Sequence, residues 1–163
     1  MDEPPTGLSP ATTTDTHWLW AFAPKADEPP TWGKWLWFLP MATLDTGWRL
    51  IHDAVRASQL GPVAKAGTLI NAARGDDTRR VICIYTADLH ERTATKAEAE
   101  RVLLALRHLG VPHRLAYKTN DTTHAGIYGD GAATFVSPTG TTKMIDRAAP
   151  RSAARRRAAR RRQ

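Results

Sequence analysis

Tryptophan-rich strands constrain the fold more than any other feature of this sequence. All six tryptophans lie between positions 18 and 48, and four of them fall in two short runs, HWLWAF at 17–22 and KWLWFL at 34–39. Aromatic runs of this length, bounded by proline-containing segments, are typical of β-strands. Alternate side chains of a strand share a face. The two runs therefore present aromatic pairs, Trp18 with Trp20 and Trp35 with Trp37.

These aromatic pairs predict a large aromatic core. Each buried ring of this size removes about 150–250 Å² of surface from water, so we expect the strand tryptophans and Trp48 to be mainly core residues. Trp32 differs, because it lies in the proline-rich segment PKADEPPTW next to Gly33. Aromatic side chains in loops commonly carry binding, so Trp32 is a candidate stacking platform for a flat ligand.

Two helices interrupt the strand pattern. Apolar residues at 44, 48, 51 and 55 fall on one helical face, with Thr43 or Asp45 available to cap the start. A second apolar stripe follows Thr95 and Glu98, which have the spacing of a capping box, and Gly110 predicts where that helix stops. Both segments are therefore predicted to be amphipathic helices that pack on a sheet.

The remaining apolar runs complete the predicted order β-β-α-β-β-α-β-β-β. They lie at 63–70, 80–86, 113–117, 124–128 and 133–136. This order predicts an α+β fold, with a largely antiparallel sheet and the helices packed on one face. We expect a disordered lead at 1–16, a single domain at 17–145 and a disordered tail at 146–163.

The charge of +7 is confined to the tail. Residues 151–163 hold seven arginines and no acid, which leaves residues 1–150 near neutral. One interpretation is nonspecific contact with nucleic-acid phosphates, and the other is a solvated end. The tail residues that would make such contacts are Arg155, Arg156, Arg157, Arg160, Arg161 and Arg162.

Composition narrows the setting of the protein. No apolar run approaches the ~20 residues of a membrane span, and the acidic, proline-rich start is unlike a secretory signal. Cys83 is the only cysteine, so we expect a reduced, cytoplasmic protein. No histidine or carboxylate spacing is typical of a metal site, and we expect neither a metal nor a cofactor.

Several segments, taken in order, resemble one family. They are GKWLWFLP, DTGW, LGPVAKAGT, VICIYTADL, LRHLGV and YKTNDTTHAGIYG, and together they span about residues 17–137. This series is similar to the Bles family, named after the basophilic leukaemia expressed protein and described as a domain of unknown function. The resemblance implies a fold similar to the cap-binding translation initiation factor, a curved antiparallel sheet backed by helices. Bacterial members are often named as phosphothreonine lyases.

Two lysines stand out as candidates for binding or chemistry. Lys65 and Lys118 interrupt apolar strand segments, and TNDTTH follows Lys118 directly, bringing Thr123 and His124. Lysine, hydroxyl and imidazole groups gathered at strand ends suit a phosphate site. We therefore expect a phosphorylated or nucleotide-like anion to bind near these residues and Trp32, with both lysines on the same concave side of the sheet.

The alternative is a lyase that eliminates phosphate from phosphothreonine. Lys65 or Lys118 would take the α-proton, and His124 would protonate the leaving phosphate. An arginine clamp would come from Arg79, Arg80 or Arg114. A third interpretation of the two lysines is structural, because charged side chains at a sheet edge discourage edge-to-edge pairing.

Overall fold

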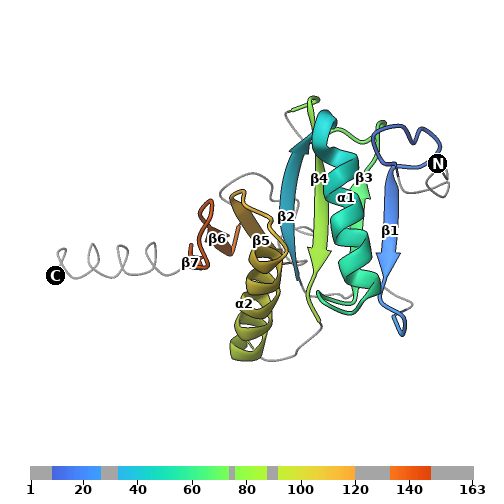
Figure 1. The fold of residues 1–163 in the computed structure, drawn as a ribbon. Coiled ribbons are helices and arrows are strands. Elements are labelled where there is room, and N and C mark those ends of the chain that lie inside the picture. The colour runs from blue at the N-terminus through green and yellow to red at the C-terminus, as the bar shows by residue number, and fades with distance from the viewer. Residues whose placement is uncertain (1–8, 27–32, 74–75, 88–91, 120–132, 148–163) are drawn as a thin grey trace, which may run out of the picture.

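The structure is a computed structural model, and it describes residues 9–26, 33–73, 76–87, 92–119 and 133–147. These residues form seven strands and two helices, whose arrangement can be followed in Figure 1. In chain order they are β1 (Trp18–Phe22), β2 (Gly33–Pro40), α1 (Met41–Arg56), β3 (Val63–Gly67), β4 (Arg79–Tyr85), α2 (Arg92–His108), β5 (Leu115–Thr119), β6 (Phe135–Ser137) and β7 (Ile145–Asp146).

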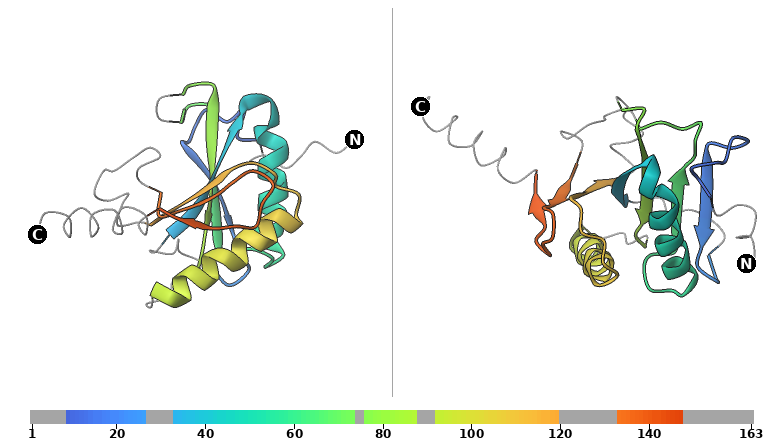
Figure 2. Two further views of the ribbon diagram at one scale, coloured as in Figure 1. Left: turned by 90° about the vertical axis from the view of Figure 1, so that its left-hand side faces the viewer. Right: turned by 45° about the horizontal axis from the view of Figure 1, so that its top comes forward.

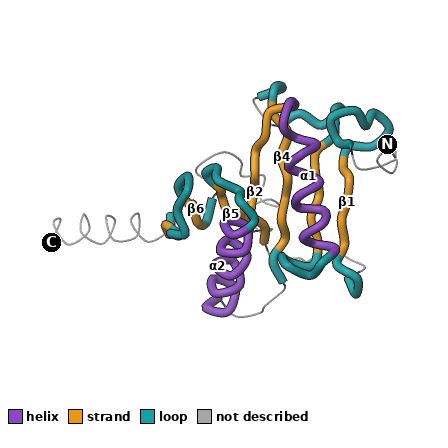
Figure 3. Tube along the Cα trace, viewed as in Figure 1, coloured by secondary structure: helices purple, strands orange, loops and turns teal. Residues whose placement is uncertain are grey.

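The strands form one open sheet in the order β1-β3-β4-β2-β5-β6-β7. Every pair of neighbouring strands is antiparallel. Both helices lie on the same face of this sheet, where α1 packs on β1 to β4 and α2 packs on β2 (Figures 2 and 3). The predicted α+β class, with helices on one face of an antiparallel sheet, is therefore confirmed.

Helix α1 buries the apolar face that the sequence predicted. Leu44, Trp48, Ile51 and Val55 are all fully buried. The predicted cap is wrong, because the helix begins at Met41 after Pro40 and has no side-chain cap hydrogen bond. The carboxylate of Asp45 instead accepts hydrogen bonds from Ser9 and Ala11.

Asp45 thereby ties down part of the predicted disordered lead. Its two oxygens accept from the Ser9 hydroxyl at 2.7 Å and from the Ala11 amide at 2.9 Å. The Leu69 amide also donates to the Pro10 carbonyl. For residues 9–16 the expectation of disorder is wrong, because these contacts fasten the segment to α1 and to the turn after β3. At the other end, β7 runs to Asp146, one residue past the expected boundary at 145.

Helix α2 starts earlier than its capping signal. It begins at Arg92, so Thr95 lies inside the helix, where it is buried, and the predicted capping box is wrong. Glu98 instead forms an ion pair with Arg101, with 2.6 Å between the charged atoms. Gly110 does follow the end of α2 and adopts a positive φ of 91°, a conformation that favours glycine, as predicted.

The later strands follow the prediction less closely. Strand β5 begins at Leu115, two residues after the predicted start, and β6 overlaps the predicted run at 133–136. Strand β7 was not predicted, because its two residues carry no periodic pattern. The strand expected at 124–128 lies outside the described residues.

The tryptophans divide between the two faces of the sheet. Trp35 and Trp37 belong to the core beneath the helices, where their indole nitrogens donate to the Ala99 carbonyl and to Nδ1 of His113. Trp18 and Trp20 lie on the opposite face, and Trp20 remains 39% exposed. The expectation that all strand tryptophans fill the core is therefore wrong for Trp20, because neither described helix covers this side, whereas Trp18 packs against a smaller core cluster of Val63, Cys83 and Tyr85.

Candidate anion site on the helix-free sheet face

The face of the sheet away from the helices carries three lysines. Strand register defines this helix-free face, because directly opposed residues of antiparallel strands point the same way. Lys65 lies opposite both Trp20 and Cys83, and Lys34 lies opposite both Tyr85 and Lys118. Cys83 and Tyr85 are two residues apart on β4, so both rows lie on the same face.

The lysines of the helix-free face lie on strands that carry no acidic residue. Strands β1 to β6 contain no Asp or Glu. Within the part of the chain that the structure describes, the ion pairs are His52–Asp53, Arg79–Asp76 and Arg101–Glu98. Lys34 and Lys65 therefore have no described carboxylate partner.

Aromatic rings surround the ammonium group of Lys65. Its Nζ lies 3.9 Å from the ring centroid of Trp18, 5.2 Å from that of Trp20 and 5.9 Å from that of Tyr85. Such cation–π contacts hold the charge without hydrogen bonds. Burial lowers the pKa of Lys65 below its ordinary value, Cys83 opposes this shift, and the charge of Lys34 adds to it.

Lys34 is more deeply buried than Lys65. Its side chain lies at the start of β2, only 8% exposed, with Nζ 5.3 Å from the ring centroid of Tyr85. Lys118 lies directly opposite on β5 and is 7% exposed. Lysine is rarely buried to this degree unless its charge is compensated.

Cys83 marks where the three positive charges converge. Burial raises the pKa of its thiol, while Lys34, Lys65 and Lys118 all act to lower it. All three ammonium groups therefore lie within electrostatic reach of one buried atom. Burial also raises the pKa of Tyr85, so its hydroxyl stays protonated at neutral pH. Protonated amines and a phenol around one centre can bind an anion by charge and by hydrogen bonds.

The structure brings only part of the predicted site together. Lys65 and Lys118 share the helix-free face, three interstrand spacings of ~4.8 Å apart, or about 14 Å between strands. Lys34 lies between them in the sheet order, and the sequence analysis missed it. Trp32, Thr123 and His124 lie outside the described residues, as do the tail arginines Arg155, Arg156, Arg157, Arg160, Arg161 and Arg162.

None of the three arginines proposed as a phosphate clamp is placed beside the lysines. Arg80 lies on the helix side of β4, and its guanidinium donates to backbone carbonyls such as that of Thr68 at 2.8 Å. Arg79 pairs with Asp76 at the far end of the same strand. Arg114 precedes β5, four residues or about 13 Å along the chain from Lys118. Arg80 is therefore a structural residue, and lysines dominate the site.

The fold and this face define an α+β domain with an open, lysine-bearing sheet surface. A family model described as basophilic leukemia-expressed protein Bles03 matches residues 26–125. The chain therefore belongs to the Bles03 family. The matched region contains all three lysines and Cys83, and it begins after β1.

Two further findings concern which kinds of site the described residues can form. Neither described helix has the length and apolar character needed to cross a bilayer. Within the described ranges, no group of three His, Cys, Asp or Glu side chains is placed to hold a metal ion. The candidate site is thus a cluster of lysines and aromatic rings.

Proposed function

We propose that the helix-free face binds a phosphorylated or nucleotide-like anion. The observation that carries this proposal is that Lys34, Lys65 and Lys118 share one sheet face with Cys83, on strands that hold no acidic residue. Burying Lys34 and Lys65 on one face, with no described carboxylate partner, is unfavourable unless negative charge compensates them. A phosphate group would supply that charge and accept hydrogen bonds from several ammonium groups at once.

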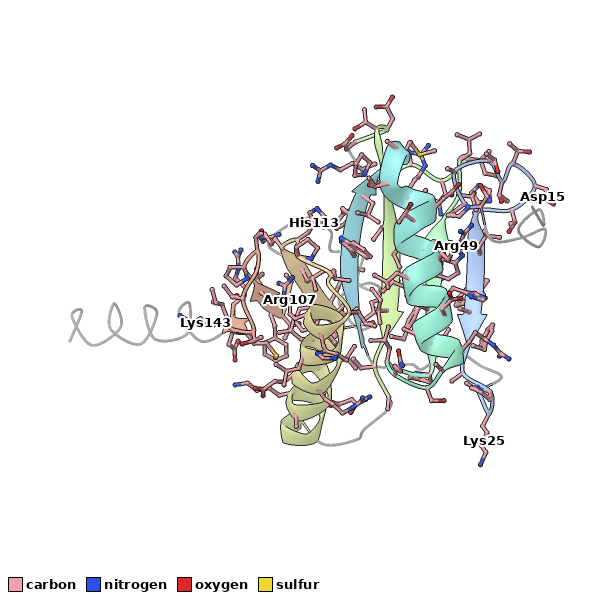
Figure 4. All side chains as sticks on the ribbon, viewed as in Figure 1. Asp15, Lys25, Arg49, Arg107, His113 and Lys143 are labelled. Atoms are coloured by element: carbon pink, nitrogen blue, oxygen red, sulfur yellow. The ribbon has the colours of Figure 1, made fainter. Side chains whose placement is uncertain are left out.

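Binding of inorganic pyrophosphate, measured by calorimetry at low salt, tests this proposal. K34Q and K65Q each remove one charge from the face and should weaken binding by about tenfold or more, the value of a charge-assisted hydrogen bond. The matched control is K143Q, because Lys143 is an exposed lysine outside the strands (Figure 4). Equal affinity for K34Q, K143Q and the unmodified protein would refute the proposal.

The second candidate function is a lyase that acts on phosphothreonine, and the lowered pKa of Lys65 favours it. A larger fraction of neutral amine makes this lysine a better general base. In the reaction the amine would take the α-proton, the bond between Cβ and the phosphate oxygen would break, and phosphate would leave with the electron pair. The products would be a dehydrated residue, phosphate and the protonated lysine.

A phosphothreonine peptide distinguishes binding from this chemistry. Elimination removes the mass of phosphoric acid from the peptide, whereas hydrolysis restores the hydroxyl. If the peptide is recovered intact after long incubation at high protein concentration, the lyase function is wrong and the binding function stands. K65Q is the matched variant, since it should abolish the elimination.

Three broader expectations also remain proposals. We propose a cytoplasmic setting, which the free Cys83 supports. A likeness to the cap-binding translation initiation factor is supported by the open antiparallel sheet with helices on one face. Nonspecific association of the arginine-rich tail with nucleic acid is supported by its charge alone.

A further inference from the structure

An aromatic surface adjoins the lysines on the helix-free face. Trp20 of β1 lies nearly parallel to Phe22 and to Tyr85, with 18° between the ring planes in each pair. The ring centroids are 5.9 Å and 6.4 Å apart. The three rings are stacked with a common orientation, and Trp20, which is 39% exposed, is the open member of this aromatic stack.

Trp20 and Lys65 form the junction between this surface and the positive charges. They are register partners on β1 and β3, with Nζ of Lys65 5.2 Å from the Trp20 ring centroid. Beyond Lys65, the charges of Lys34 and Lys118 act on the same thiol of Cys83. The exposed ring of Trp20 therefore lies next to Lys65, and Lys34 follows two strands further along the sheet.

We propose that this face binds a nucleoside polyphosphate, with the base on Trp20 and the phosphates on Lys65 and Lys34. The inference rests on the proposed anion-binding function and specifies the ligand class. Any of the nucleic-acid bases can stack on an aromatic ring, because every base has a π-face. Lys65 and Lys34 lie two interstrand spacings apart, so their long side chains can reach the phosphates of one short polyphosphate. A single-stranded nucleic acid, in contrast, spreads its phosphates along the strand and would need further cations beyond this span.

Tripolyphosphate is the matched ligand for the test, since it carries the phosphates of a nucleoside triphosphate without the base. Calorimetry would compare the two with the full chain, at one salt concentration and in the presence of EDTA. We expect the nucleoside triphosphate to bind about tenfold more tightly, the effect of one stacked base. Trp20→Ala should remove this difference, so that the variant binds tripolyphosphate and the nucleoside triphosphate with equal affinity.

Phe38 supplies a matched aromatic control. It lies on the same face and is also 39% exposed, but it is on β2, three strands away from β1. Phe38→Ala should therefore keep the tenfold preference for the nucleoside triphosphate. A variant that loses the preference as Trp20→Ala does would overturn the assignment of the base to Trp20.

The remaining outcomes separate this inference from the proposed function. Equal affinities for tripolyphosphate and the nucleoside triphosphate would overturn the nucleotide assignment and leave anion binding intact. Binding of neither would refute both. An eight-nucleotide single strand that binds more tightly than the nucleoside triphosphate, and that K34Q and K65Q weaken, would overturn the polyphosphate in favour of a nucleic acid. The tail arginines are present in every variant, so these differences report on the helix-free face.

Discussion

Replacing Lys34 by methionine should make the free protein more stable and the ligand-bound protein weaker. Methionine keeps the apolar stem and removes a charge that is 8% exposed. In the sheet order Lys34 and Lys65 are two interstrand spacings apart, or about 10 Å between strands. With their two-residue offset in register the separation is about 12 Å, and at an effective dielectric constant of ~20 two like charges then repel by about 1.4 kcal/mol, which salt reduces to about 0.5–1 kcal/mol.

Two further contributions of Lys34 affect the stability, and they have opposite signs. The contact between Nζ and the Tyr85 ring, 5.3 Å from its centroid, stabilises the protein by about 0.5–1 kcal/mol. Removing the charge also removes the cost of burying it, about 1 kcal/mol at the low end for a buried polar group, and this adds to the gain. We therefore expect K34M to raise the free energy of unfolding by about 1 kcal/mol, which for a chain of this length raises Tm by about 3 °C.

Urea and thermal unfolding in phosphate-free buffer would measure this gain. The exposed Lys143 gives the control variant K143M, which should change stability by less than about 0.5 kcal/mol. With tripolyphosphate at ~100 times its dissociation constant, the unmodified protein gains about 2.7 kcal/mol, whereas a tenfold weaker variant gains about 1.4 kcal/mol. The stability gain of K34M should therefore disappear in saturating ligand. A free K34M protein that is less stable than the unmodified protein would refute the reasoning and make Lys34 a structural residue.

Three further predictions follow from the charges and contacts of named residues. The folded-state pKa of Lys65 lies below its ordinary value of 10.5, so between these two values the unfolded chain binds more protons and stability rises with pH. In urea unfolding between pH 7 and 11, the advantage of K65M over the unmodified protein should shrink with rising pH, and a constant difference would contradict the lowered pKa. Arg107 of α2 donates to carbonyls before β5 and after β6 (Figure 4), including those of Val111, His113 and Thr141, so R107M should lower the free energy of unfolding by about 2–4 kcal/mol in urea. Deleting residues 151–163 should remove a log–log salt slope of about −6 for duplex DNA binding, from ~0.9 per phosphate, and an unchanged slope in filter binding would exclude the tail.

The order of the secondary-structure elements was predictable because each carries its own period. Trp35 and Trp37 alternate with Leu36 and Phe38, and α1 places its apolar residues on one helical face. The helix starts were not predictable from capping residues. The Asp45 carboxylate accepts a hydrogen bond from Ser9, before β1, and Glu98 forms an ion pair with Arg101 one turn further along α2. In both helices tertiary or side-chain partners replaced the local cap.

The candidate site was only half predictable for a different reason. Lys65 stands between alanines in a short strand, so its charge is conspicuous in the sequence. Lys34 precedes a run of large apolar residues, and a lysine at that position is also typical of the polar end of a strand, so it gives no sign of a site. Only the register shows that Lys34 lies between the other two lysines in the sheet order, since β2 is paired with both β4 and β5. Alternation places residues on a face, but pairing between distant strands decides which faces meet.

The two faces of the sheet follow different rules, and the difference supports the functional interpretation. On the helix side, Trp35, Ile82 and Tyr117 are fully buried and agree with a core that hydrophobic patterning alone would build. On the helix-free side, Lys34 and Lys118 are nearly as buried, although patterning would place apolar residues there. One face of the sheet follows hydrophobic patterning, and the other departs from it at neighbouring positions. Departures of this kind are expected at functional sites. If Lys34 served only solubility, its side chain would be exposed as those of Lys25 and Lys143 are (Figure 4), and not 8% exposed.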